Sequence, residues 1–470
     1  MRRTLVLLFA IGAAAGPVAA DEASELRALR DEVARERAEL RKEREALQEQ
    51  RRRVDEALAA VENAHAAPDG STTGVSPAAV SAENEKRARL DVYGFAQLDA
   101  IHDFARVDPD WNATLRSSRI PVTCPRDAGC GNEGETILSV RQSRLGFKGF
   151  LPTRFGEMKT IFEFDLFGVG EDAGQTTFRL RHAWGELGDF GAGQTWSLFM
   201  DPDVFPNTVD YWGPSGMVFL RNPQVRWSPW FLRTENLKVS FAIEAPGSGV
   251  DEGKLNLLDE NLQVDAWNTY PDLTTQVRYA GDWGHVQLAG IFRALGFEGT
   301  SPLTGNDFRG REAGWGVNAS HVLNLGVVHE AVERDQILLQ LVYGHGISNY
   351  MNDGGVDLAP DRFGPGAGAT AVASIGWLAY YNRTWNDQWT SSFGFSEHRQ
   401  DTTAGQADGA MDTIQYLSVN TLYHPIPEML VGPEVLWGTR SNRDGDQGTD
   451  TRVQLSFKYN FAGTILGGDR

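Results

Sequence analysis

From Leu90 onward the sequence consists of segments of about ten residues in which apolar and polar side chains alternate. Near the C-terminal end, for example, Leu455 and Phe457 alternate with Gln454 and Ser456. A period of two places the apolar set on one face of a β-strand and the polar set on the other. We expect sixteen strands, near residues 90–103, 136–149, 157–167, 176–188, 189–197, 217–228, 235–245, 272–281, 284–293, 311–321, 335–344, 374–382, 388–396, 411–422, 429–437 and 450–461.

The segments between these strands alternate between short and long. Short turns are expected around 151–153, 188–189, 282–284, 386–387 and 425–427. Long connections are expected at 104–135, 198–216, 246–271, 294–310, 345–373, 397–410 and 438–449, and 322–334 is longer than this scheme requires. Short turns at one end and long loops at the other are typical of an outer-membrane β-barrel, whose strands need ~9–11 residues to cross the bilayer. A β-propeller or a sandwich gives no reason for this asymmetry.

The same alternation also occurs in a soluble sheet with one wet face. The position of the tryptophans favours the barrel, because aromatic residues gather at both membrane interfaces. Near strand ends lie Trp184, Trp196, Trp227, Trp230, Trp283, Trp385 and Trp389. Residues 90–461 are therefore predicted to form an all-β transmembrane barrel of about sixteen antiparallel strands.

Composition excludes several other classes of protein. The chain has 470 residues, and 44 Lys and Arg against 63 Asp and Glu give a formal charge of −19, which argues against a nucleic-acid partner. Two cysteines exclude a disulfide-rich scaffold and a four-thiolate zinc site. No apolar run approaches the ~18 residues of a membrane helix. We expect no cofactor and no metal.

The N-terminal residues 1–20 have the features of a secretory signal peptide. Arg2 and Arg3 precede an apolar stretch that is too short to anchor the mature chain, and small residues end at Ala20. Export leads to an oxidising compartment, where Cys124 and Cys130 are close enough in sequence to form a local disulfide. A redox-active or metal-binding role for this pair is less favoured, because no histidine or third cysteine lies nearby.

Residues 21–62 contain no Gly or Pro and predict an α-helical coiled coil. Apolar residues recur every seven positions, at Leu26, Val33, Leu40, Leu47, Val54 and Val61. This spacing indicates a left-handed coiled coil for self-association, although the row three positions on is mostly polar. A solvated single helix held by Glu–Arg pairs is the alternative. Residues 63–89 read as a flexible linker, and 462–470 as a C-terminal tail after the last strand.

A barrel of sixteen strands is wide enough to hold an aqueous channel. The long loop after the fifth strand is the candidate constriction, and it contains Asp201, Asp203 and Asp210. Strand alternation places basic side chains on the opposing polar wall, and the predicted set is Arg144, Lys148, Lys159, Arg179, Arg181, Arg221 and Arg226. Such a ladder would bind carboxylates or phosphates weakly enough to release them. The alternative is that some of these residues only solvate or brace the wall.

Several stretches carry a family resemblance. RQSRLGFKGF at 141–150, followed by MKTIFEFDLFG at 158–168, resembles general bacterial porins. The stretch 179–214, which contains AGQTW, and RNPQVRWSP at 221–229 are similar to the DcaP family of trimeric outer-membrane porins, as is DVYGFAQLDAIHDF at 91–104. The resemblance implies a sixteen-stranded homotrimer in outer-membrane lipid, a periplasmic coiled coil, and uptake of small anions, dicarboxylates among them. It also implies that the arginines of RQSR, RLRH and RNPQVRW line the pore.

One departure from the pattern concerns the C-terminus. Outer-membrane barrels typically end on an aromatic residue, whereas AGTILGGDR follows Phe461 here. Three other functions are weighed against the anion porin. They are a coiled-coil envelope tether anchored by the barrel, a phosphate- or sugar-selective porin of the same architecture, and an outer-membrane hydrolase. The hydrolase is disfavoured because the histidines are scattered and no GxSxG motif is present.

Overall fold

The computed structural model describes residues 88–123, 134–257, 262–300, 308–364 and 367–466. The predicted signal peptide (1–20), coiled coil (21–62), nearly all of the linker, and Cys124 and Cys130 lie outside these residues. Within the described ranges no helix has the length and hydropathy needed to span a membrane.

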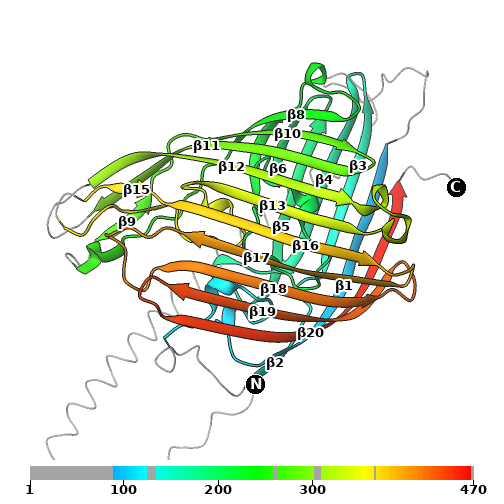
Figure 1. The fold of residues 1–470 in the computed structure, drawn as a ribbon. Coiled ribbons are helices and arrows are strands. Elements are labelled where there is room, and N and C mark those ends of the chain that lie inside the picture. Colours follow the sequence, from blue (N-terminus) through cyan, green and yellow to red (C-terminus); the bar gives the residue numbers. More distant parts are fainter. Residues whose placement is uncertain (1–87, 124–133, 258–261, 301–307, 365–366, 467–470) are drawn as a thin grey trace, which may run out of the picture. The chain divides into compact units, whose positions relative to one another are not determined.

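The described chain forms one closed antiparallel sheet (Figure 1). Its strands are β1 (Arg89–Asp103), β2 (Glu135–Ser139), β3 (Arg144–Thr153), β4 (Gly156–Phe167), β5 (Thr176–Leu187), β6 (Phe190–Trp196), β7 (Arg221–Trp227), β8 (Leu237–Glu244), β9 (Gln263–Ala266), β10 (Asp272–Gly281), β11 (Gly284–Thr300), β12 (Phe308–Asn324), β13 (Gln336–His345), β16 (Ala373–Thr384), β17 (Trp389–Gln400), β18 (Met411–Tyr423), β19 (Met429–Asn442) and β20 (Gln447–Leu466). A separate small sheet pairs β14 (Leu358–Pro360) with β15 (Ala369–Ala371).

In two places, two consecutive strands together form a single crossing of the barrel wall. β2 and β3 both pair with β1, and β9 and β10 both pair with β11, so the eighteen strands of the sheet make sixteen crossings. Each crossing pairs with the next along the chain, and β1 closes the barrel on β20, from Leu90 opposite Leu466 to Asp103 opposite Arg452. The predicted sixteen-stranded antiparallel barrel is confirmed.

Some predicted boundaries are wrong. Residues 294–310 and 438–449 are not long loops, because β11, β12, β19 and β20 extend into them. The last strand does not end at Phe461, since β20 continues to Leu466 beside the start of β1. In both cases backbone pairing continues past the point where the apolar alternation fades.

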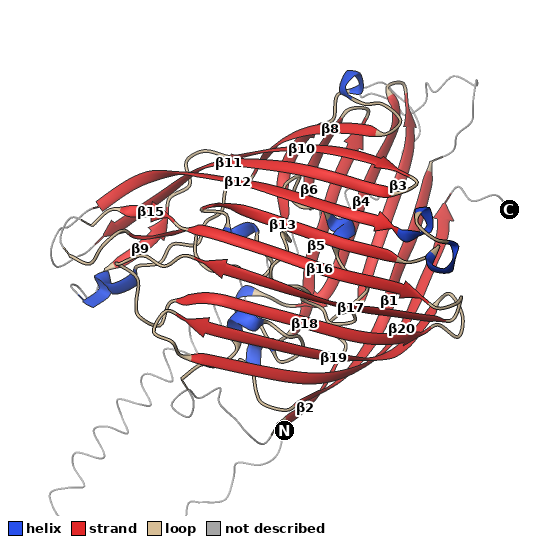
Figure 2. Cartoon of the chain, viewed as in Figure 1, coloured by secondary structure: helices blue, strands red, loops and turns tan. Residues whose placement is uncertain are grey.

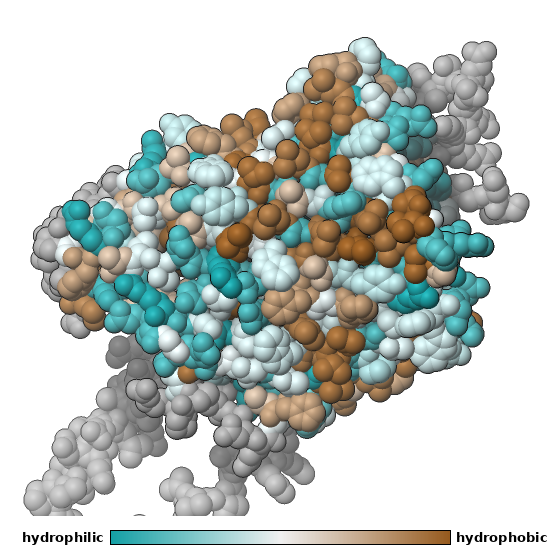
Figure 3. Space-filling view, in the orientation of Figure 1, coloured by the Kyte–Doolittle hydropathy of each residue, from teal (hydrophilic) through white to brown (hydrophobic). Residues whose placement is uncertain are grey.

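The faces of the wall are reversed relative to a soluble protein. Outward side chains such as Phe178, Leu288 and Leu341 are 75%, 55% and 53% exposed, whereas the inward Ser418 and Gln454 are buried. Figure 3 shows apolar side chains gathered in a band across the strands, with hydrophilic ones toward both ends. This is the arrangement expected when the outside contacts lipid and the inside contacts water and loops.

The tryptophans divide between the two faces. Trp227, Trp230, Trp385 and Trp389 are exposed near strand ends, as predicted. Trp184 is only 7% exposed. A bulge in the pairing of β4 with β5, between Glu163 and Phe164, shifts the later residues of β5, so Trp184 lies on the inner face.

The long loops gather at one end of the barrel and the short turns at the other (Figure 1). Gly156 (φ 115°) and Gly188 (φ 61°) adopt the left-handed backbone that tight turns require. The 3-10 helices of the described residues belong to the connections between the strands (Figure 2). They are Pro109–Trp111, Ser117–Arg119, Gly170–Asp172, Pro202–Val204, Trp230–Leu232, Gly253–Leu257, Leu325–Val327, Glu330–Val332 and Ser348–Tyr350.

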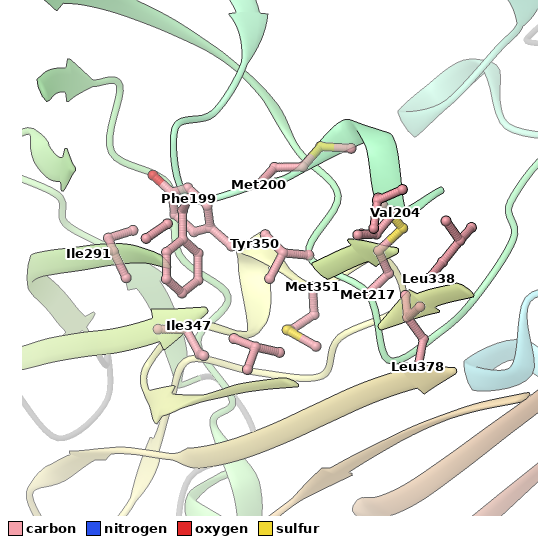
Figure 4. Packing of buried hydrophobic residues seen from close by; sticks show 14 of the residues in the cluster. Phe199, Met200, Val204, Met217, Ile291, Leu338, Ile347, Tyr350, Met351 and Leu378 are labelled. Carbon is pink, nitrogen blue, oxygen red and sulfur yellow. The ribbon is translucent and has the colours of Figure 1, made fainter. Parts of the chain in front are cut away.

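The loop between β6 and β7, residues 197–220, folds into the barrel and is called the inner loop below. Its Phe199, Met200, Val204 and Met217 are fully buried. They pack on inward side chains of the wall and on the loop between β13 and β16, and the cluster includes Ile291, Leu338, Leu378, Ile347, Tyr350 and Met351 (Figure 4). Burial of this apolar surface is what holds the inner loop inside the barrel.

Candidate functional site: an arginine cluster beside the inner loop

One end of the inner loop is fixed by Asp201. Its carboxylate accepts hydrogen bonds from His285 on β11 (2.7 Å) and Ser320 on β12 (2.6 Å), and it pairs with Arg278 on β10 (3.3 Å). Burial acts to raise the pKa of Asp201, but the hydrogen bonds from His285 and Ser320, together with the charges of His285 and Arg278, hold this pKa below its usual value. Asp203 also binds Arg278. Both carboxylates therefore anchor the loop to the wall.

These groups also form the one cluster of possible metal ligands found among the described residues. The ligand atoms of Asp201, Asp203 and His285 lie within 4.8 Å of one another. Arg278 contacts all three side chains. The guanidinium already supplies the positive charge that a cation would bring.

The middle of the inner loop is fixed by Asp210. This carboxylate accepts hydrogen bonds from the Thr114 hydroxyl (2.8 Å), the backbone N–H groups of Leu115 and Gly213 (both 3.1 Å), and Tyr416 (3.1 Å). Burial raises the pKa of Asp210. Next to it, the backbone N–H groups of residues 209 and 210 donate to Glu434 on β19. The inner loop thus bridges two parts of the wall, β10 to β12 and β18 to β19.

Four of the predicted basic residues come together on the other side of the inner loop, and we call them the arginine cluster. They are Arg144 on β3, Arg179 and Arg181 on β5, and Arg221 at the start of β7. The carboxylates among them are Glu163 and Asp165 on β4. Four guanidinium groups against two carboxylates leave a formal excess of two positive charges.

The ion pairs within the cluster are unequal. Arg181 contacts Glu163 (2.6 Å) and Asp165 (2.9 Å), and Arg179 forms a two-pronged pair with Asp165 (3.1 and 2.6 Å). Arg144 lies 3.6 Å from Glu163. Arg179 and Arg181 share the inner face by alternation, and the bulge in β5 buries the consecutive residues Arg181 and His182 together. Removal of either carboxylate would leave the surrounding arginines repelling one another.

Arg221 differs from the other three because it has no carboxylate partner among the described residues. Its Nη1 is buried and has no hydrogen-bond partner. The guanidinium instead stacks on Trp196 at 4.7 Å and on Phe219 at 5.6 Å, and Arg181 lies 5.9 Å from the same indole. Such cation–π contacts hold the group in place without neutralising its charge.

The side of the inner loop that faces the cluster is aromatic and not acidic. Tyr211 donates to Asp165 (2.6 Å) and stacks on Phe167 at 3.9 Å. A cavity of about 280 Å³, the cluster cavity, separates this surface from the wall. It is bordered by Arg144, Arg181, Trp196, Phe205, Asn207, Tyr211, Phe219 and Lys458, among others. Asp210 also borders it, although its side chain is almost fully buried.

The remaining predicted basic residues lie elsewhere. Lys148 stacks on Tyr93 at 4.7 Å. Lys159 is exposed and lies 3.8 Å from Glu186. Arg226 donates to the backbone oxygen of Trp196 at 2.6 Å. Of the seven predicted basic residues the structure brings four arginines together, and the predicted loop carboxylates Asp201 and Asp203 pair with Arg278 and not with this cluster.

Sequence reasoning did not single out Lys458 or Tyr211. Lys458 stacks on Phe95 at 4.0 Å in the cluster cavity, opposite Gln97 across the closing pair of strands. Its alternation with Phe457 was the available signal, and closure of β20 on β1 brings it near Arg144. Tyr211 carried no signal, since its role depends on the path of the inner loop.

A further set of contacts, centred on Arg116, joins three loops at the loop end of the barrel. Arg116 lies between the rings of Trp111 and Trp212, at 4.1 and 4.2 Å, and pairs with Asp353 at 3.0 Å. Asp353 also accepts the backbone N–H of Ser118 at 2.7 Å. Burial lowers the pKa of Arg116 despite this pair. The contacts join the first long loop, the inner loop and the loop between β13 and β16.

A family model described as DcaP outer membrane protein matches residues 43–461. The crystal structure of the outer membrane channel DcaP of Acinetobacter baumannii aligns with a TM-score of 0.65 and 19% identity, covering 81% of this chain and 99% of that one. No curated protein matches.

More distant alignments include an anion-selective porin from Comamonas acidovorans (TM-score 0.47, 10% identity, 80% of this chain and 100% of that one). They also include Salmonella typhi OmpF in complex with daunomycin (TM-score 0.48, 13% identity, 79% of this chain and 97% of that one). Both TM-scores lie below 0.5.

Proposed function

The chain belongs to the DcaP outer membrane protein family, and from that premise we propose that it is a porin that favours small anions, dicarboxylates among them. An outer-membrane family and a closed sixteen-stranded barrel support an outer-membrane location and a channel function. The family and its structural neighbours are porins and channels, which are typically not enzymes.

The observation that carries the anion preference is the excess positive charge of the arginine cluster. It lies beside the inner loop, where the lumen is narrowed, and two of its four guanidinium charges are not compensated by Glu163 and Asp165. The loop carboxylates Asp201 and Asp203 are taken up by Arg278 and His285, so they do not offset the cluster. A fixed positive field at a constriction raises the local concentration of anions.

The oligomeric state, the N-terminal segments before the barrel and the disulfide belong to the same proposal. The resemblance to trimeric porins supports a homotrimer in outer-membrane lipid. The sequence patterns support cleavage of residues 1–20, a periplasmic coiled coil at 21–62, a linker and a disulfide between Cys124 and Cys130. Chemical cross-linking of the full chain in detergent tests the trimer, and thiol labelling with and without reductant tests the disulfide.

The test of selectivity is a reversal potential in planar bilayers under a salt gradient, repeated with succinate as the sole anion. Anion selectivity with succinate carried, or transiently blocking, supports the proposal. Cation selectivity contradicts it and leaves a barrel with another solute. Absence of conductance would instead favour a coiled-coil tether anchored by the barrel. Competition between succinate, phosphate and a neutral sugar distinguishes the dicarboxylate porin from the phosphate- or sugar-selective alternatives.

A further inference from the structure

A second cavity lies next to the cluster cavity, and we call it the side chamber. Its volume is about 340 Å³, and Tyr211 and Phe219 border both cavities. Of the arginine cluster, Arg179 and Arg221 line the chamber. Small-molecule sites of proteins begin at ~300 Å³, so the chamber has room for one compact ligand.

The charge of the side chamber fits one carboxylate. Arg179 is already held by both oxygens of Asp165. Arg221 has no ion pair among the described residues, and its buried Nη1 has no hydrogen-bond partner. A buried donor without a partner carries a desolvation cost that a bound anion would offset. A second carboxylate on the same ligand would find no free cation in the chamber.

The walls of the side chamber fit an apolar body. Tyr211, Trp212, Phe219, Leu220 and Met351 line it. Amide side chains come only from Gln194, Asn349 and Asn352. Rings that meet edge to face or offset gain ~0.5–1.5 kcal/mol beyond burial of area. The lining therefore distinguishes a ligand with a ring from a small aliphatic anion.

We propose that the side chamber is a binding site for aromatic monocarboxylates, with Arg221 holding the carboxylate and the rings of Tyr211, Trp212 and Phe219 holding the aromatic body. The inference rests on the proposed function in one respect, since the anion must enter the barrel to reach the chamber. It goes further by assigning a preference for ring-bearing monoanions to a site separate from the cluster cavity.

The experiment compares benzoate with acetate as blockers of single-channel current carried by the full-length protein. Both are monocarboxylates of equal charge, so a difference reports the body of the ligand. We expect half-block by benzoate at a concentration about tenfold lower than by acetate. Arg221→Gln should raise the half-block concentration of benzoate about tenfold, as for loss of one hydrogen-bonded charge. Phe219→Leu should weaken benzoate about threefold and leave acetate unchanged.

The matched control is Arg334→Gln, which removes an arginine from an exposed pair with Asp387 outside both cavities, and it should change neither blocker. Equal block by benzoate and acetate overturns the proposal, and so does retention of benzoate block in Arg221→Gln. If that variant loses its oligomeric state while its half-block concentration for benzoate is unchanged, Arg221 serves contacts between copies and the proposal fails. If Arg221→Gln does not fold, the block of Phe219→Leu by benzoate and acetate tests the proposal, and unchanged benzoate block in that variant overturns it.

The proposed anion selectivity of the porin is tested by a separate measurement, the reversal potential in simple salt. This measurement does not involve the ratio of benzoate to acetate block. A channel that is not anion-selective but still prefers benzoate keeps the chamber and loses the anion porin. A channel that selects anions but does not prefer benzoate to acetate supports the anion porin and contradicts the binding site in the side chamber.

Discussion

At the scale of single residues, the arginine cluster is defined by incomplete pairing. Glu163 and Asp165 are each shared between two arginines, and Arg221 has neither. Burial without full compensation is costly for structure, so such groups concentrate at functional sites. The cluster is therefore the part of the barrel where a change of one charge should alter function more than stability.

Arg144→Gln tests this directly. The substitution lowers the formal excess of the cluster from two charges to one, and a unit charge ~8 Å from a passing anion is worth about 2 kcal/mol at an effective dielectric constant of ~20. We expect the reversal potential in a salt gradient to move toward cation selectivity, most strongly at low ionic strength. An unchanged potential in a correctly folded variant would remove the cluster from the selectivity mechanism.

Glu163→Gln is the opposite change. It raises the excess of positive charge and leaves the Arg181 Nε facing an amide. Anion selectivity should increase in the same measurement, and thermal stability should decrease because the arginines repel one another. Tyr93 also donates to Glu163 at 2.8 Å, and the amide oxygen can still accept this bond.

At the scale of elements, the inner loop is attached at two points, near its start and in its middle, by buried carboxylates whose pKa values shift in opposite directions. The pKa of Asp201 is held below its usual value, so this anchor stays ionised across neutral and mildly acidic pH. Burial raises the pKa of Asp210, so its protonated form is favoured in the folded loop. The stabilisation that comes with protonation is complete below the ordinary pKa of 3.8 and is lost as pH rises through the raised value.

Current noise from the inner loop should therefore decrease on acidification from neutral pH. Asp210→Asn, which mimics the neutral carboxyl, should remove that dependence. Asp210→Ala should instead increase the noise at every pH, because it leaves Thr114 and two backbone N–H groups without their acceptor, at ~1–3 kcal/mol each. Single-channel recordings between about pH 4 and pH 7.5 check the prediction; identical pH profiles for wild type and Asp210→Asn would contradict it.

The strands could be predicted from sequence and the loop contacts could not. Alternation and turn residues depend on neighbours along the chain, so they predict all sixteen crossings. The partners of Asp201 and Asp210 come from β10 to β12, β18 and the first long loop, and no local pattern encodes them. The inward turn of Trp184 depends on one bulge, which strict alternation misses.

At the scale of the whole molecule, the apolar band fixes where the barrel contacts lipid. Leu341 lies in the middle of β13 on the outer face and is 53% exposed. Leu341→Arg should lower the free energy of unfolding in lipid by ~2–4 kcal/mol, the cost of arginine near the bilayer midplane. Val328→Arg, in the connection between β12 and β13, should cost no more than ~1 kcal/mol. Urea titration of the barrel in vesicles measures both, and equal costs would place the membrane elsewhere.

The closure of β1 on β20 has a consequence for how the protein is made. The pairing joins residues near the start of the described chain to residues at its end, such as Leu90 and Leu466. Until β20 has been synthesised, β1 has only one side paired, and an unpaired strand edge is not tolerated in hydrocarbon. Insertion must therefore wait for the complete chain, and the export route has to keep every strand soluble until the last one arrives. Contacts between such distant residues are also slow to form, so closing this seam is expected to limit the rate of assembly.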